Sequence, residues 1–488
     1  MALFRGEENV QAMDGRKMPL MKVISQTLKY ISTRAIEKLK DQLGEEIVKK
    51  EKLRWVLTVP ALWSEKMKMF MRQAAVEAEI IPNWNSDKLW LCLEPEGASI
   101  QCREDIEEEE LREKMTKGSI ILVLDCGGGT VDITVSKLKC EPNEAFLSEE
   151  VLPSSGGCEW GSKYVDQNFE KFLGCFLGPE LFSLYSKNAS ARFEILQHFE
   201  LLKKKFMPGT GNGYRLQLSY LSEYLNTKKL KDLTNNYNNS VGKEYQVSVK
   251  GSSCIYLSQD LMMSFFKPLV EKIKAKVEEL LIQVYKKEGY NVKFIFMVGG
   301  FSESPYLKSE IKKKFQNNET TVLIPKRPLI SVIRGACMFG LNPRIITSRI
   351  AKKTYGINTL TVFDPNRHPE KKKVIIEGED FCEDVFDAFV KKDQSVRVDE
   401  VVNKVYCPVR ARQSVMRIII YSTDSTDVEF VDEKGVEKLG ELSIDLGKNT
   451  LEDKTVTVTM RFGSTSIMVT VMNKKGESRN CEFKFESK

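Results

Sequence analysis

Apolar residues recur at intervals of three and four positions over Pro19–Leu43, a spacing that predicts an amphipathic helix. Residues 53–59 form an apolar run that Pro60 ends, which is typical of a strand. A second helix is expected after Ser64, a residue suited to an N-cap, and a second short strand at Leu89–Leu93. Because helices and strands alternate, this part of the chain predicts a parallel strand pair joined by a crossover helix.

The most informative pattern is an apolar strand over Ile120–Cys126 that runs into a glycine-rich turn and a second strand. Asp125 stands near the end of the first strand and Asp132 near the start of the second. The turn between them consists of Gly127, Gly128, Gly129 and Thr130. Glycines let backbone N–H groups approach phosphate, and carboxylates on both arms of a hairpin suit a metal-bound phosphate. A tight hairpin without a ligand has the same local sequence, so the turn alone leaves both interpretations open.

A second glycine turn follows an apolar strand over Val292–Val298. Gly299 and Gly300 end this strand, and Ser302 can cap a helix that carries Pro305 in its first turn. A strand, two glycines and a helix N-terminus together form an edge that suits an anion or a nucleotide. We therefore expect the two glycine turns to act as partners.

Between the two glycine turns the chain is mainly helical. The clearest helix spans Ser258–Lys287, with Pro268 as a predicted kink and Gly289 as its end. After Pro343 the pattern changes to short strands separated by turn residues, which predicts a separate β-sandwich domain. Its strands are expected at Val415–Ser422, Val428–Asp432, Thr455–Phe462, Ser466–Asn473 and Cys481–Glu486.

Composition and charge narrow the class of protein. The chain has 488 residues, 42% of them hydrophobic and 29% charged, as in a globular protein of two to four domains. A net charge of +6 that is spread along the chain argues against nucleic acid binding. Two histidines and eleven cysteines without a Cys-x-x-Cys pair argue against a zinc site. A polar start and the lack of a long apolar run predict no membrane span and a cytoplasmic, or alternatively nuclear, location.

The motifs resemble those of the actin-like ATPase superfamily and, within it, the 70-kDa heat-shock chaperone family. They follow the family's order over about residues 20 to 345, at Thr58–Ala61, Glu94–Ala98, Leu124–Asp132, Gly156–Gly157 with Asp166 and Phe169, Val298–Gly300 with Pro305, and Arg334–Cys337. More closely, the chain resembles the atypical branch called heat shock 70 kDa protein 12. That closer resemblance rests on residues 54–63, Tyr355-Gly356 and Cys382–Asp387.

This resemblance implies an α/β fold with the two-lobe, ribonuclease H-like domain of actin-like ATPases and a C-terminal β-rich domain. Residues 1–117 are expected to be a remnant of lobe I, residues 118–345 lobe II, and residues 346–488 the β-rich domain. A helical insertion is expected at about 166–289. The family's opening Asp-x-Gly-Thr-Thr turn and its catalytic lysine have no counterpart, so we expect an N-terminally truncated chain with an incomplete first lobe.

The resemblance also implies ATP or ADP and Mg²⁺ as cofactors. Asp125 is expected near the attacking water and near the metal, which it contacts through water. Glu94 is expected to be the acid near the catalytic water, and Asp132 is expected to support the metal shell. The nucleotide is expected to contact Gly127, Gly128, Gly129, Thr130, Gly156, Gly157, Glu200, Lys203, Gly299 and Gly300. A surface ion pair would also explain the spacing of Glu200 and Lys203 on one helix face.

Three functions are weighed on these motifs. The first is an atypical heat-shock-70-like, ATP-binding chaperone or regulatory factor, with hydrolysis impaired because the first phosphate motif is absent. The second is a non-catalytic scaffold that retains the ATPase fold. The third, a sugar or metabolite kinase of the same superfamily, needs a catalytic acid and sugar-contacting residues in the first lobe, and we find no such set. Protein partners are expected to bind the β-rich domain.

Overall fold

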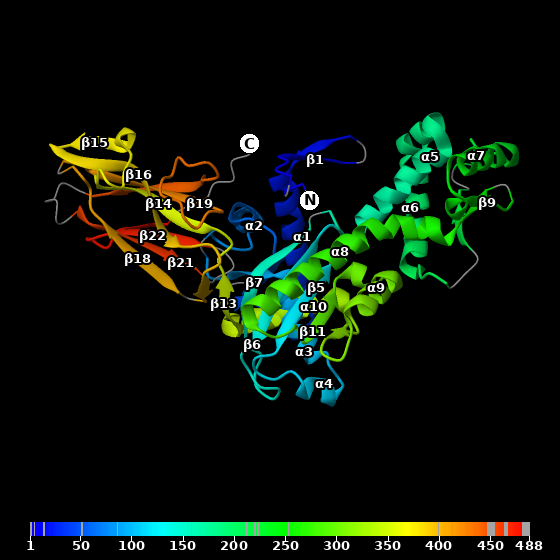
Figure 1. Ribbon diagram of the computed structural model, residues 1–488, viewed down its shortest axis with the longest axis horizontal. Coiled ribbons are helices and arrows are strands. Elements are labelled where there is room, and N and C mark those ends of the chain that lie inside the picture. The colour runs from blue at the N-terminus through cyan, green and yellow to red at the C-terminus, as the bar shows by residue number, and fades with distance from the viewer. Residues whose placement is uncertain are drawn as a thin grey trace.

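The computed structural model describes residues 2–480 apart from 4, 13–14, 50–51, 85, 158, 210–212, 219–220, 222–223, 252, 399, 411, 447–453 and 463–466. A central α/β body lies between a β-rich region on one side and a mainly helical arm on the other (Figure 1). Within the described residues, no helix is both long and apolar enough to cross a bilayer.

The central body is built on a seven-stranded sheet in the order β12-β11-β5-β6-β7-β13-β17. Its strands are β5 (Ile120–Cys126), β6 (Val131–Leu138), β7 (Ser148–Gly157), β11 (Phe294–Val298), β12 (Thr321–Leu323), β13 (Ile346–Ile350) and β17 (Ser395–Arg397). β11 runs parallel to β5 and β12, whereas β6 runs antiparallel to β5 and β7. The ends of β5 and β11, each followed by a glycine turn, therefore meet at one edge of the sheet.

Helices cover both faces of this sheet, which explains why its central strands are apolar throughout. Alternate residues of β5 belong to hydrophobic clusters on opposite faces of the sheet. Leu122 packs in one cluster with α8 (Gln259–Glu288) and α9 (Pro305–Phe315). Val123 packs in the other with α3 (Glu94–Glu104) and α10 (Pro328–Leu341). The short α4 (Glu109–Glu113) follows α3. Burial on both sides fixes the strand that carries Asp125.

The N-terminal part contains the predicted parallel pair, β3 (Trp55–Val59) and β4 (Leu89–Leu93), joined by α2 (Glu65–Glu77). Ser64 caps α2 by accepting a hydrogen bond from the Met67 N–H at 3.3 Å, as expected. Before this pair lie the hairpin of β1 (Asn9–Gln11) and β2 (Lys17–Pro19) and the helix α1 (Leu20–Leu43). In the part of the chain that the structure describes, β3 and β4 form a sheet of two strands.

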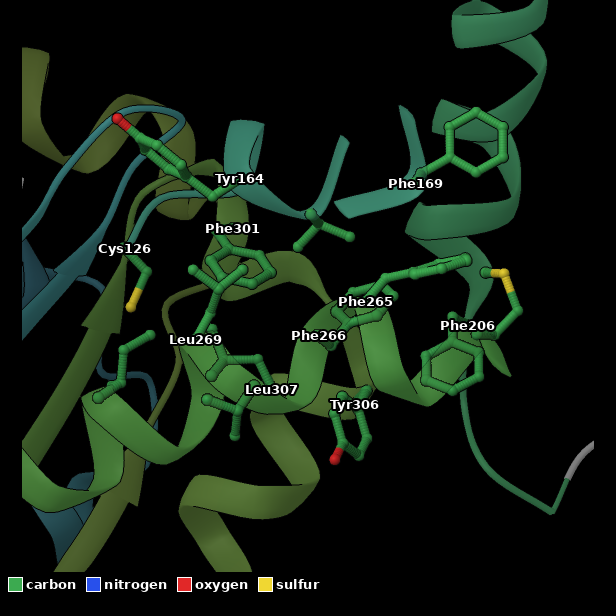
Figure 2. Packing of buried hydrophobic residues seen from close by; sticks show 14 of the residues in the cluster. Cys126, Tyr164, Phe169, Phe206, Phe265, Phe266, Leu269, Phe301, Tyr306 and Leu307 are labelled. Atoms are coloured by element: carbon green, nitrogen blue, oxygen red, sulfur yellow. The ribbon is translucent and has the colours of Figure 1, made fainter. Parts of the chain in front are cut away.

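The helical arm contains three helices and a small sheet: α5 (Lys163–Lys187), α6 (Ala189–Lys205), α7 (Thr227–Ser240), β8 (Tyr214–Gln217), β9 (Val247–Val249) and β10 (Cys254–Leu257). α8 leads back to the body, with Ser258 as its N-cap and Gly289 in the left-handed conformation at its end. Pro268 lies inside α8. Figure 2 shows aromatic rings between arm and body. Phe266 of α8 stacks on Phe206 at 5.0 Å and lies 6.4 Å from Phe301, next to the second glycine turn.

The C-terminal region is a sandwich of a five-stranded sheet, β15-β16-β14-β19-β20, and a four-stranded sheet, β18-β21-β22-β23, that share one apolar core. The first sheet contains β14 (Thr354–Val362), β15 (Lys373–Ile376), β16 (Glu379–Val390), β19 (Val415–Thr423) and β20 (Glu437–Asp445). The second contains β18 (Val401–Tyr406), β21 (Val456–Arg461), β22 (Met468–Asn473) and β23 (Ser478–Asn480). The expected strands near 415, 455 and 466 correspond to β19, β21 and β22.

Two strand predictions fare differently in this domain. The prediction for Val428–Asp432 is wrong, because Phe430 forms only an isolated bridge to Val385. The Glu433 carboxylate accepts the N–H groups of Glu429 and Phe430 and so bends the segment out of a ladder. The prediction for Cys481–Glu486 lies outside the described residues.

Candidate functional site

The β5–β6 hairpin brings the two predicted carboxylates together. Asp125 and Asp132 are direct partners in the antiparallel register, so their side chains lie on the same face of the hairpin. Both are buried, with 7% of Asp125 and 1% of Asp132 exposed. The turn is closed by a hydrogen bond of 3.0 Å from the Gly127 N–H to the Thr130 carbonyl.

The glycine turn between these carboxylates is held on one side by the start of α5. The carbonyls of Gly127 and Gly128 accept the N–H groups of Ser162 and Lys163, at 3.2 and 2.9 Å. A side chain at Gly161 would come within 2.5 Å of the Gly128 carbonyl carbon, which is why this approach needs glycine. On the other side, a Cβ added at Gly128 would meet open space. Ser162 and Lys163, which the sequence did not single out, therefore orient the turn and leave its other face accessible.

The second glycine turn lies beside Asp125, since Val298 pairs with Asp125 in the parallel β11–β5 register. Gly299 has a φ of +81°, and a Cβ there would clash with the Asp125 Oδ1 and the Cys126 carbonyl. The structure thus brings Gly299 and Gly300 together with the hairpin. The prediction that Ser302 caps the following helix is wrong. Ser302 lies in a short 3₁₀ turn and donates its hydroxyl to the Val298 carbonyl at 2.5 Å, because the chain makes this extra turn before the helix.

The N-cap of α9 is instead Ser304, whose hydroxyl oxygen accepts the Leu307 N–H at 3.4 Å. Pro305 occupies the first turn, as expected. The cap shifted by two residues because both serines suit an N-cap and the sequence does not show where the 3₁₀ turn ends.

Gly156 and Gly157 end β7 at the same edge of the sheet, opposite Asp132 and Val131 in the β6–β7 register. A Cβ at Gly156, whose φ is +145°, would clash with the Val131 carbonyl, and one at Gly157 with the Trp160 ring. Both glycines therefore permit close packing around the strand that carries Asp132. Their predicted contact with a nucleotide stays a prediction.

A third carboxylate, Glu94, begins α3 directly after β4. Burial raises its pKa to about 8, with a further increase from the negative charges of Asp125 and Asp132. Burial and the charge of Asp132 raise the pKa of Asp125 to about 7. Burial also raises the pKa of Asp132, while hydrogen bonds from the Thr130 hydroxyl and the Leu62 N–H oppose this change. The effect of Asp125 and Asp132 on the pKa of Glu94 shows that the three acids lie close enough to interact.

These acids suit Mg²⁺, which prefers carboxylate oxygen and keeps several of its waters. Among the described residues, no group of three or more acidic, cysteine or histidine side chains is arranged to enclose a metal ion by itself. A magnesium ion here would therefore take its remaining ligands from water and phosphate. The indirect role of Asp125 at the metal stays a prediction.

Glu200 and Lys203 lie on α6 in the helical arm, where Lys203 is buried in a set of three charges. Its Nζ lies 2.5 Å from a Glu200 carboxylate oxygen and 2.8 Å from one of Asp166 on α5. The predicted pair thus exists, but its partner Asp166 joins two helices of the arm. The recorded ion pairs of Lys203 do not bring it to the carboxylates of the hairpin.

Sequence reasoning missed a half-buried cation near Asp132, Lys352, in the segment between β13 and β14. Its Nζ donates to the carbonyl of Ala61, next to Leu62, whose N–H binds Asp132 at 3.0 Å. Burial, followed by the charge of Lys68, lowers the pKa of Lys352 to about 8. A cavity of about 80 Å³ lies beside it, lined among others by Glu65, Lys68, Glu150 and Tyr355. Nothing in the local sequence of Lys352 indicates this position.

Comparisons with known proteins show the family to which the chain belongs. No family model matches the chain. It is 31% identical over 522 residues to heat shock 70 kDa protein 12A of Homo sapiens, which covers 96% of this chain and 75% of that protein. The chain belongs to the heat shock 70 kDa protein 12 family. It is 30% identical to heat shock 70 kDa protein 12B of Homo sapiens, over 95% of this chain and 75% of that protein.

Membership of the heat shock 70 kDa protein 12 family confirms the predicted fold class. A more distant similarity, 23% over 310 residues, links 62% of the chain to 43% of the chaperone protein DnaK of Thermoplasma volcanium. These relatives imply an actin-like ATPase fold, and the structure is mixed α/β with several sheets and a β-rich region.

Proposed function

We propose that this chain is an atypical heat-shock-70-like protein that binds ATP or ADP with Mg²⁺ in front of the β5–β6 hairpin. The observation that carries the proposal is the meeting of two buried acids, Asp125 and Asp132, and the half-buried Glu94 with two glycine turns at the ends of β5 and β11. Hydrogen bonds and the charge of Lys352 partly compensate Asp132, whereas Glu94 and Asp125 lack such groups among the described residues and so cost stability, a cost that Mg²⁺ would offset. The open side of the Gly128 turn gives phosphate a place beside the metal.

Within this proposal, each group of residues has a separate role in binding or orienting the reactants. The N–H groups of Gly128 and Gly129 bind phosphate oxygens, and Asp125 orients a water of the metal. Glu94, at the start of α3, accepts a proton from the attacking water or orients it. Bound Mg²⁺ neutralises charge on the phosphate oxygens. Gly299 and Gly300 let the ribose side of the nucleotide approach the backbone.

We infer further that hydrolysis by this polypeptide is slow. The Thr130 hydroxyl is engaged by Asp132, and the Lys352 ammonium, which acts electrostatically on Asp132, donates to Ala61. Neither group is thus aimed at a transferring phosphate. Since each missing electrostatic donor costs about 10²–10³ in rate in enzymes that have been dissected, a low rate is expected.

The alternative is a non-catalytic scaffold that keeps the ATPase fold. One observation favours it: Lys203, the expected ribose or adenine contact, is buried and already neutralised by Glu200 and Asp166. In both cases we propose that protein partners bind the β-rich domain. We also propose a cytoplasmic location, with the nucleus as the alternative.

Titration with Mg·ATP by calorimetry tests the proposal. We expect saturable binding that weakens about tenfold or more in Asp125→Asn, because loss of one charged contact at a metal-phosphate site costs at least about 1.4 kcal/mol. Asp232→Asn, an exposed acid on α7, is the matched control and should bind as the unmodified chain does. Absence of binding up to roughly millimolar ATP would leave the scaffold as the function. A single-turnover rate that matches a full-length relative would disprove slow hydrolysis.

A further inference from the structure

The five-stranded sheet of the β-rich domain ends in an unusually apolar edge strand, β15. It is the outermost strand of its sheet and lies at the far end of the β-rich region (Figure 1). Its sequence is Lys373-Val374-Ile375-Ile376, and 72% of Ile375 is exposed. Exposed apolar edge strands invite pairing with another strand, so natural proteins usually protect them.

The hairpin register determines which backbone groups of β15 face outward. β15 and β16 are joined by the two-residue turn Glu377-Gly378, with φ of +51° and +89°. Because Ile376 and Glu379 flank this turn, they form a hydrogen-bonded pair, and the alternation of the ladder turns the N–H and C=O of Ile375 away from β16. Ile375 therefore presents a donor and an acceptor at the outer edge.

The opposite edge of the same sheet, β20, is protected by charged side chains, unlike β15. β20 carries Glu437, Lys438, Glu441 and Asp445 at exposed positions, so charges of both signs interrupt it along its length. Around β15 the charges are instead sorted by sign along the chain, basic before the strand and acidic after it. Exposed Lys371 and half-buried Lys373 stand at its start, after exposed Glu370, and Lys373 also pairs with Asp380 of β16 at 2.8 Å. Exposed Glu377, in the turn, and exposed Glu379, at the start of β16, follow its end.

This sorting makes β15 complementary to itself. When two copies run antiparallel, the basic start of each lies beside the acidic end of the other. A two-fold axis at Ile375 also lets the two Ile375 residues exchange both backbone hydrogen bonds. We propose that β15 is a homodimerisation edge, at which a second copy of this chain adds its own β15 to form one continuous sheet.

A row of apolar side chains supports this arrangement on one face of the sheet. Val362, Phe381 and Val374 are successive partners across β14, β16 and β15, and 70% of Val362 is exposed. In the proposed register, Ile376 of the second copy continues this row beside Val374. The contact is small, in the class below about 1,200 Å² of total buried area, so we expect a dissociation constant in the micromolar range.

Sedimentation equilibrium of the full chain, over roughly micromolar to submillimolar concentrations chosen for an interface of this size, tests the proposal. We expect a monomer–dimer equilibrium that Ile375→Lys weakens by about tenfold or more, because it places two like charges face to face on the axis. Val405→Lys, on the edge strand β18 of the other sheet and 64% exposed, is the matched control and should not change it. An unchanged thermal unfolding temperature verifies that Ile375→Lys still folds. A monomer throughout, or a dimer that Ile375→Lys leaves intact, would overturn the proposal.

A charge exchange tests the register directly. Lys371→Glu reverses one charge at the basic start of β15, and Glu377→Lys reverses one charge at its acidic end. Each variant alone thus weakens the pairing of opposite charges and should dimerise about threefold to tenfold more weakly. An equimolar mixture of the two variants should dimerise as the unmodified chain does, since each interface end then joins opposite charges. A mixture no stronger than the separate variants would rule out this antiparallel pairing.

Discussion

Glu94 and Glu96 lie two residues apart in the first turn of α3, yet their surroundings are opposite. Glu96 is buried and binds Arg349 through both carboxylate oxygens, at 2.6 and 2.8 Å. Glu94 has no ion pair among the described residues, and its charged neighbours are Asp125 and Asp132. The fold thus compensates one acid and leaves the other uncompensated. Acids that are removed from water without a cationic partner cost stability, which supports our proposal that a ligand completes this site.

Removing the partner of Glu96 should have the largest effect. Arg349→Met leaves a buried carboxylate unpaired, which typically costs about 3–5 kcal/mol, and urea unfolding should show a loss of this size. Arg397→Met, an exposed arginine on β17, is the control and should change stability by less than about 0.5 kcal/mol. Adding Glu96→Gln to Arg349→Met should restore part of the loss. A loss in Arg349→Met no greater than in the control would contradict the structural role of this pair.

The uncompensated acids should make the protein less stable as pH rises. The folded-state pKa values of Glu94 and Asp125 are raised to about 8 and about 7, so between about pH 4.5 and pH 8 the folded state binds more protons than the unfolded state. The unfolding free energy therefore falls with pH in this window, by about 2–4 kcal/mol in the absence of Mg²⁺. Urea unfolding at several pH values measures it. The double variant Glu94→Gln, Asp125→Asn should flatten this dependence; a steep fall in that variant would assign it to other groups.

The two acids of α3 also show what the sequence could predict. Glu94 could be singled out from the sequence because it belongs to a local motif, as do Asp125, Asp132 and their turn. The pairing of Glu96 with Arg349 joins residues 253 positions apart and has no local signal. The folded structure is therefore needed to show which of the two neighbouring acids has a cationic partner.

The same distinction applies to the fold. The central sheet could be predicted because its strands are buried on both faces and read as apolar runs. β16 (Glu379–Val390) was missed because its exposed positions are acidic, and β15 because it has four residues after a basic run. In the charge cluster of the arm, the pair of Glu200 and Lys203 could be predicted because both residues lie on one helix. The third member, Asp166, comes from α5 and could not be predicted from local spacing.

A smaller effect is expected at Gly299, whose lack of a side chain lets the backbone after β11 pass close to Asp125. Gly299→Ala puts a Cβ against the Asp125 carboxylate and the Cys126 carbonyl at a positive φ, and we expect a loss of about 2–3 kcal/mol in urea unfolding. Gly300→Ala is a close control. Its Cβ would meet only the flexible end of Leu329 at 3.1 Å, so its cost should be below about 1 kcal/mol. Equal losses in the two variants would show that Gly299 is not needed for the approach to Asp125.

The smallest effect should have the opposite sign. Glu94→Gln removes a negative charge from the cluster, so at pH 8 without Mg²⁺ it should stabilise the protein by about 1 kcal/mol in urea unfolding, while turnover of Mg·ATP should fall. Glu96→Gln makes the same chemical change two residues away and should destabilise, because it leaves Arg349 without its carboxylate. Destabilisation by both variants would mean that Glu94, too, is compensated by the fold. Opposite signs on one turn of one helix would identify Glu94 as the acid that the fold leaves for a ligand.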